Sequence, residues 1–232
     1  MAALIDNHVQ VFSAGNVTSL TSASWTIAGS NLRLYQQAAS GAGTVLNPSS
    51  CKIGGSGGTS LSVIGTTQDL GANGKHTLYA LTAPSAGSTT SYVDWASNQD
   101  ETFLIAVSTK DTDQTTPNNT VASATGSNVS PTASATSVAG DLVLGFMFYL
   151  DSGANAATWT RGGQTVLETI RDASTPYEGI DAAYQTAAGT STAASWSISG
   201  TGAIDEWGVF ALAVNAAAGG GGGGGAAAAA HH

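Results

Sequence analysis

Two aspartates, Asp111 and Asp113, lie one residue apart in the stretch KDTDQTTP near the middle of the 232-residue chain. Carboxylates at alternate positions can begin a calcium loop, but calcium needs several converging oxygen ligands and usually a bidentate carboxylate to close the shell. No acidic residue follows Asp113 until Asp141. Asp side chains also cap turns by accepting backbone N–H bonds, and Pro117 cannot continue a strand ladder. We therefore expect the pair to cap a turn and keep a metal site as the weaker alternative.

Aromatic residues beside polar side chains are the second chemical candidate. Trp159 with Arg161, and Tyr177 in the stretch Ser174–Glu178, could form a lectin-like site in which exposed rings stack on a sugar. The alternative is that these rings fill the core. We expect the core position for the other four tryptophans, which are Trp25, Trp95, Trp196 and Trp207.

Hydrolytic chemistry has little support in the sequence. Glycoside hydrolysis needs two carboxyl groups facing each other, whereas the neighbours in Asp100–Glu101 and Asp205–Glu206 point to opposite faces of a strand. A structural role at loop ends is favoured for these two pairs. A hydrolase remains an alternative hypothesis, with Asp94, Asp151 or Glu178 as its candidate carboxyls.

Other catalytic patterns are also weak. His76 follows Gly74–Lys75 at an expected turn, where exposure is a simpler explanation than a catalytic base. No Gly-x-Ser-x-Gly elbow supports a serine nucleophile, because Gly55–Gly57 is expected to be a flexible hairpin tip, and the glycine-rich stretch 54–58 lacks the lysine and helix of a phosphate loop. We expect no enzyme activity and no cofactor.

Composition limits the partners. Six basic against fifteen acidic residues give a net charge of −9, which disfavours nucleic acid and anionic membranes. Cys51 is the only cysteine, so an intrachain disulfide is impossible. The apolar run at the start of the chain is too short for a signal peptide, and synthesis in a cytoplasm is expected.

Alternating runs bounded by Gly, Ser, Asn and Pro predict an all-β, antiparallel two-sheet sandwich. Charged residues make up only 9% of the chain, too few for amphipathic helices. Strands are expected over 8–12, 24–27, 32–35, 77–81, 91–95 and 102–107. Asp141–Leu150 is apolar nearly throughout, which predicts a central strand buried on both faces.

A repeated spacing of similar residues suggests two half-repeats within one sandwich, 31–110 and 137–215, joined by a crossover at 111–136. Gly58, Tyr79 and Asp100 are matched by Gly163, Tyr184 and Asp205, each 105 residues later. Residues 1–30 would form an N-terminal arm with the first strands, and 216–232 a Gly/Ala-rich tail that acts as a flexible tether.

Several of these features together resemble the concanavalin A-like jelly-roll domains of phage virion proteins and bacterial surface proteins. They are the Gly-Gly hairpin, a Tyr strand leading into Ala83–Gly87, the DQTTP stretch, and Ser137–Gly145. The resemblance spans roughly 32–214, although the alternating acids of jelly-roll glucanases are missing. It implies a jelly-roll fold and a place on the virion surface.

The resulting functional expectation is a non-enzymatic capsid decoration protein. Its partners would be the major capsid protein or other virion subunits, together with further copies of itself. The alternative is a carbohydrate-binding module, adhesin or tail-fibre domain that contacts host surface glycans through Trp159, Arg161 and Tyr177.

Overall fold

The computed structural model describes residues 2–41, 43, 45–71, 73–151, 158–172, 177–200 and 204–218. These residues contain no helix, and every ladder between named strands is antiparallel. The all-β prediction is confirmed. Within the described part of the chain, no helix has the length and apolarity needed to cross a membrane.

The first half of the chain forms an inner and an outer sheet. The inner sheet has the order β1 (Leu4–Ser13), β12 (Glu101–Lys110), β4 (Arg33–Gly41), β9 (Gly74–Thr82) and β7 (Ser62–Val63), with β8 (Gln68–Leu70) also on β9. The outer sheet has the order β2 (Val17–Thr21), β11 (Ser91–Gln99), β5 (Ser50–Ile53) and β6 (Thr59–Ser60), and β3 (Trp25–Ile27) pairs separately with β10 (Gly87–Thr89).

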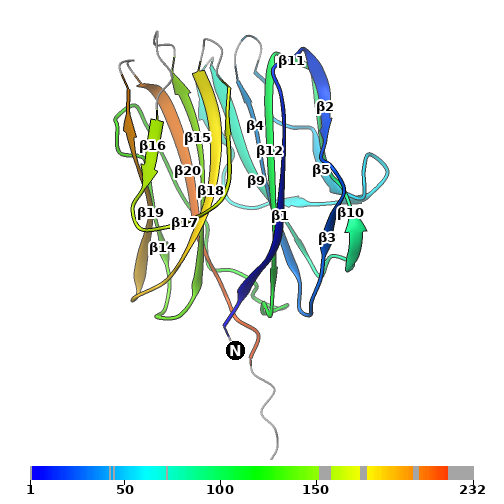
Figure 1. Ribbon diagram of the computed structural model, residues 1–232, viewed down its shortest axis with the longest axis vertical. Coiled ribbons are helices and arrows are strands. Elements are labelled where there is room, and N and C mark those ends of the chain that lie inside the picture. Colours follow the sequence, from blue (N-terminus) through cyan, green and yellow to red (C-terminus); the bar gives the residue numbers. More distant parts are fainter. Residues whose placement is uncertain are drawn as a thin grey trace, which may run out of the picture.

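The second half also forms an inner and an outer sheet. Its inner sheet has the order β13 (Ala122–Gly126), β20 (Ile204–Val214), β15 (Leu142–Asp151), β18 (Tyr177–Thr186) and β17 (Thr165–Arg171). Its outer sheet has the order β14 (Thr132–Thr136), β19 (Ser191–Ser199) and β16 (Thr158–Arg161). Figure 1 shows the sheets side by side, with the two inner sheets in the middle.

Three apolar clusters lie between these layers. The central cluster joins the inner sheets through side chains such as Phe103, Phe148 and Phe210. One outer cluster lies between the sheets of the first half and another between those of the second. Each fully buried Phe or Leu contributes roughly 1.5–3 kcal/mol of transfer free energy, so the inner sheets are stabilised from both faces.

The strands are distributed over more sheets than the two that were expected for a single sandwich. The reason is the number of strands, because additional short strands give each half a second sheet that covers one apolar face of the first. The prediction of a central strand at 141–150 is confirmed, because β15 is buried throughout its length.

Both ends of the described chain lie at one end of the molecule, called here the terminal pole (Figure 1). The expected N-terminal arm is largely integrated into the sheets, since residues 4–27 contribute β1, β2 and β3. Ala216 packs against the central cluster, and the N–H of Ala217 donates to the carbonyl of Asp111 at 2.7 Å. Residues 219–232 of the expected tail lie outside the described residues.

Candidate functional site

Trp159 does not present an open ring for a sugar. It lies on β16 with only 5% of its surface exposed. The Arg171 guanidinium carbon sits 3.9 Å from the centre of the indole ring, and the Tyr149 ring meets it edge-on at 5.2 Å. Gly179 leaves room for the indole, because a Cβ there would approach it to 2.9 Å. Of the two alternatives left open for Trp159, the structure shows the buried one, since neighbouring residues cover the ring.

Arg161 is also committed to an internal contact. Its guanidinium donates to both carboxylate oxygens of Asp181, a fully buried residue of β18. Thr169 and the Trp196 indole N–H donate to the same carboxylate at 2.6 and 2.7 Å. Four donated hydrogen bonds satisfy a charge that would otherwise be costly to bury. Arg161 therefore has a structural role, because it links β16 to β18 within the second half.

Tyr177, the third residue expected to contact glycan, begins β18 and is half-buried. Its backbone register partner is Asp151 at the end of β15. Tyr177 therefore lies at the end of an inner sheet, and because Trp159 is buried the two residues do not form a surface of exposed rings.

Asp113 caps a turn, as the sequence predicts. Its carboxylate accepts the backbone N–H groups of Thr115 and Thr116 at 2.7 and 3.0 Å. These bonds hold the pKa of Asp113 below its ordinary value because they stabilise the charged form. Asp111 has a positive φ of 56° and accepts a bond from Ser30. Within the ranges that the structure describes, no group of three His, Cys, Asp or Glu residues could hold a metal ion.

The four tryptophans expected in the core are all buried, with 3–6% of their surface exposed. Among the candidate carboxyls, Asp94 accepts a bond of 2.6 Å from the Ser50 hydroxyl on the first outer sheet. Asp151 and Glu178 are each only 1% exposed.

His76 is fully buried between the inner sheets, so the expectation of an exposed turn is wrong. The turn precedes β9, which already begins at Gly74. Gln37 Nε2 lies 2.8 Å from the carbonyl of Met147 and 2.9 Å from His76 Nε2, and His76 Nδ1 lies 2.7 Å from Gln68 Oε1. Gln68 Nε2 donates to the carbonyls of Ala124 and Val209.

These bonds define a polar network of Gln37, His76 and Gln68 that ties the two halves together. Because the amide of Gln37 donates to His76 Nε2, the histidine is neutral and carries its proton on Nδ1. Burial lowers the pKa of His76 to about 3. Such a histidine is held as a structural hydrogen-bonding group at neutral pH.

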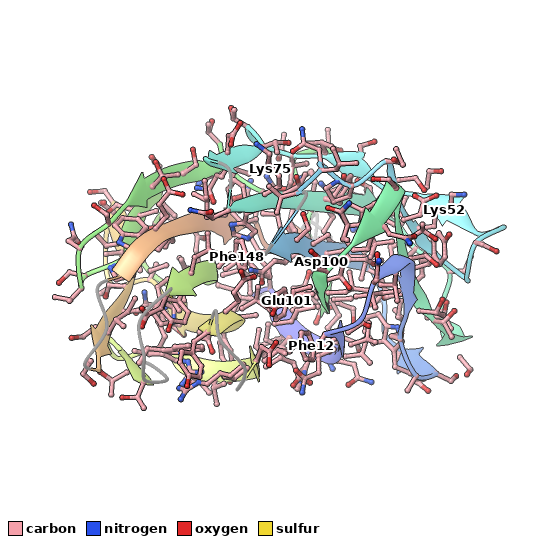
Figure 2. The ribbon with its side chains drawn as sticks, turned by 90° about the horizontal axis from the view of Figure 1, so that it is seen from above. Phe12, Lys52, Lys75, Asp100, Glu101 and Phe148 are labelled. Atoms are coloured by element: carbon pink, nitrogen blue, oxygen red, sulfur yellow. The ribbon has the colours of Figure 1, made fainter. Side chains whose placement is uncertain are left out.

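Carboxyl groups gather at the end opposite the terminal pole, called here the rim. Glu101 begins β12, Asp172 follows β17, and Glu178 lies on β18; these three residues form the rim cluster. All are buried, at 6%, 8% and 1% exposure. Figure 2 looks down on this end and shows Asp100 and Glu101 near the middle of the molecule. The sequence suggested Glu178 singly, but not its meeting with Glu101 and Asp172.

Gly41 and Gly43 have no side chains, which leaves room beside the backbone for the carboxyl groups of Glu178 and Asp100. A Cβ on Gly41 would fall 1.4 Å from Glu178 Oε2, and one on Gly43 would fall 1.8 Å from Asp100 Oδ2. Burial raises the pKa of Glu101 to about 8, and the hydrogen bond and charge of Asp172 add to this effect. Burial and the neighbouring carboxyl group therefore favour the protonated form of Glu101.

Comparison of the chain with protein-family models, with curated proteins and with solved structures finds no match.

Proposed function

We propose that this chain is a non-enzymatic structural protein of a phage particle, a capsid decoration protein that binds the shell through its terminal pole. Its partners would be the major capsid protein or other virion subunits, with further copies of the chain beside it. The resemblance described above suggests this setting. The observation that carries the proposed orientation is that both ends of the described chain leave the same pole.

We also infer that each half is a jelly roll and that the halves are related by duplication. Counting β1, β2, β4, β5, β6, β9, β11 and β12 as strands one to eight, the first half has sheets in the orders 1-8-3-6 and 2-7-4-5. Counting β13 to β20 in the same way gives 1-8-3-6-5 and 2-7-4. This agreement in order supports the jelly-roll architecture, which is common in capsid proteins.

The absence of catalysis is part of the proposal. The polar groups that could suggest chemistry have structural contacts: Arg161 with Asp181, Asp94 with Ser50, and His76 with Gln37 and Gln68. His76 is fully buried, and its lowered pKa makes it a poor general base near neutral pH.

The experiment that tests the proposed function is immunogold labelling of native particles with antibody against residues 32–214. Regular label over an icosahedral head is the expected result. Label confined to tails or fibres would replace decoration with receptor contact, and particles without label would contradict a virion role. Antibody preadsorbed with the purified protein provides the control.

A groove between the halves favours sugar binding as a second candidate function. Two adjoining hollows of about 300 and 270 Å³ lie beside β8 and β13 and share Asp69 and Thr125. Carboxylates and hydroxyls are suitable hydrogen-bonding partners for sugar hydroxyls. Retention on a glycan array that is lost in Asp69→Ala, but kept in Asp113→Ala, would support this candidate. An array without retained glycans would remove it.

A further inference from the structure

The rim cluster joins the two halves through acidic groups. Glu101 belongs to the inner sheet of the first half, whereas Asp172 and Glu178 belong to that of the second. Glu101 is the register partner of Gly41 in the ladder of β12 and β4, and a Cβ on Gly41 would fall 1.4 Å from Glu178 Oε2. The backbone N–H of Asp172 donates to the carbonyl of Glu178 at 2.8 Å. Carboxyl groups buried this close together cannot all ionise without a large cost, and two of them can bond to each other only when one is protonated.

The charges that act on Glu101 oppose its ionisation. They come from Asp172 and, more weakly, from Asp100 on the adjoining turn. The described contacts of the six basic residues are with groups outside the rim cluster. They are Arg33 with Thr82, Lys52 with Ser56, Lys75 with Asp69, Lys110 beside Gly29, Arg161 with Asp181, and Arg171 over Trp159. Other ionisable side chains at the rim ends of the neighbouring strands are Asp151 and Tyr149 on β15, Tyr177 on β18, Arg171 on β17, Glu206 on β20 and Lys75 on β9.

Ionisation removes the shared proton and leaves like charges in a buried contact. The pKa of Glu101 in the folded protein, about 8, lies above its ordinary value of 4.5. The stabilisation is thus fully present below pH 4.5 and is lost as the pH rises through 8. Farther from the rim, the halves are joined by the central cluster and by the network of Gln37, His76 and Gln68.

We propose that the rim cluster is a proton-dependent contact that keeps the two halves closed at the rim and lets that end open in alkaline solution. This inference goes beyond the proposed function, because it holds whatever the terminal pole binds. It also predicts where the change occurs: at the ends of β4, β12, β17 and β18, with the terminal pole unchanged.

The test compares the wild type with Glu101→Gln, whose amide is uncharged and can donate to both neighbouring carboxylates. Urea unfolding is followed from pH 4.5 to pH 9. The ratio of the folding equilibrium constants, wild type over variant, should fall by up to tenfold per pH unit between 4.5 and 8, the limit for one proton. Asp94→Asn, a carboxyl change on the first outer sheet, should keep the wild-type pH dependence.

Hydrogen exchange read by mass spectrometry then locates the effect. At pH 9, rim peptides from β4 and β12 should lose protection in the wild type relative to Glu101→Gln, after correction for intrinsic exchange rates. Asp172→Asn should likewise weaken the pH dependence, which provides a second test if Glu101→Gln folds poorly.

Two results would overturn the proposal. The first is an unchanged ratio of equilibrium constants from pH 4.5 to 9, or equal rim protection in wild type and Glu101→Gln. The second is stabilisation of the wild type by added Ca²⁺ at pH 8 that is lost in Glu101→Gln, because this would make the cluster a cation site.

Discussion

Replacing His76 with glutamine tests whether a neutral histidine joins the inner sheets. The side-chain amide of glutamine can accept from Gln37 and donate to Gln68, as the neutral imidazole does, but it does not titrate. The ring of His76 also packs 4.6 Å from that of Phe210, measured between centroids. The loss of this packing should cost about 1–3 kcal/mol at pH 7.

The pH dependence carries the sharper prediction. The pKa of His76 is about 3 in the folded protein and 6.5 in the reference state. The unfolded chain therefore binds a proton that the folded chain excludes, and the stabilisation present above pH 6.5 is lost as the pH falls towards 3. Between pH 7 and pH 4, the wild type should lose on the order of 3 kcal/mol relative to His76→Gln.

The assay is urea unfolding of both proteins at several pH values between 7 and 4, with the difference in unfolding free energy plotted against pH. The opposite contribution of Glu101 is common to both proteins and cancels in this difference. His8→Gln serves as a control, because His8 is partly exposed and pairs with Glu168 at 2.7 Å. Parallel loss of stability in wild type and His76→Gln would refute the neutral network.

Two further predictions concern contacts that the sequence did not reveal. Arg161→Met should lower the unfolding free energy by about 3–5 kcal/mol because it leaves the Asp181 carboxylate buried without its cation, whereas Lys75→Met, at a more exposed pair, should cost less than about 1 kcal/mol. Equal effects in chemical denaturation would contradict this reasoning. Gly41→Ala should lower the unfolding free energy by about 1–3 kcal/mol, since the added methyl group collides with the Glu178 carboxyl of the rim cluster. Gly57→Ala is the control, because a Cβ at Gly57 would meet no atom within 4 Å. A Gly41→Ala protein with wild-type melting temperature would show that the rim rearranges freely.

The strongest sequence patterns predicted the strands best. The apolar run at 141–150 identified β15 because a strand covered on both faces has little polar alternation. The crossover at 111–136 was expected to be a connection, yet it contains β13 and β14. In β14, Ala133 and Ala135 are buried while Thr132, Ser134 and Thr136 are exposed. The alternation was present, but alanine is a weak hydrophobic signal.

The repeated spacing of 105 residues did not predict which face of the sheet a side chain occupies. Tyr79 packs in the outer cluster of the first half, whereas Tyr184 borders the central cluster. A shift of one residue in a strand reverses the face of every side chain, so matched spacing of tyrosines cannot establish matched environments. The offset does hold for Ile105 and Phe210, which both face the central cluster.

The candidate sites depended on contacts between distant strands. Trp159 was compatible with either exposure or burial, and the Arg171 and Tyr149 side chains that cover its ring decide between them. Glu101 and Glu178 are far apart in the sequence and meet only because the two inner sheets face each other. Local spacing carries no signal for such a meeting.

The most direct test of the proposed role is the orientation of the bound protein on the particle. Asn98→Cys places a thiol on an exposed residue near the rim, and Val138→Cys places one on a residue that is 61% exposed near the terminal pole. The native Cys51 is buried and provides a low background. After each variant is bound to particles, maleimide labelling should remain fast at position 98 and become slow at position 138. Protection of position 98 with free labelling at 138 would contradict attachment through the terminal pole.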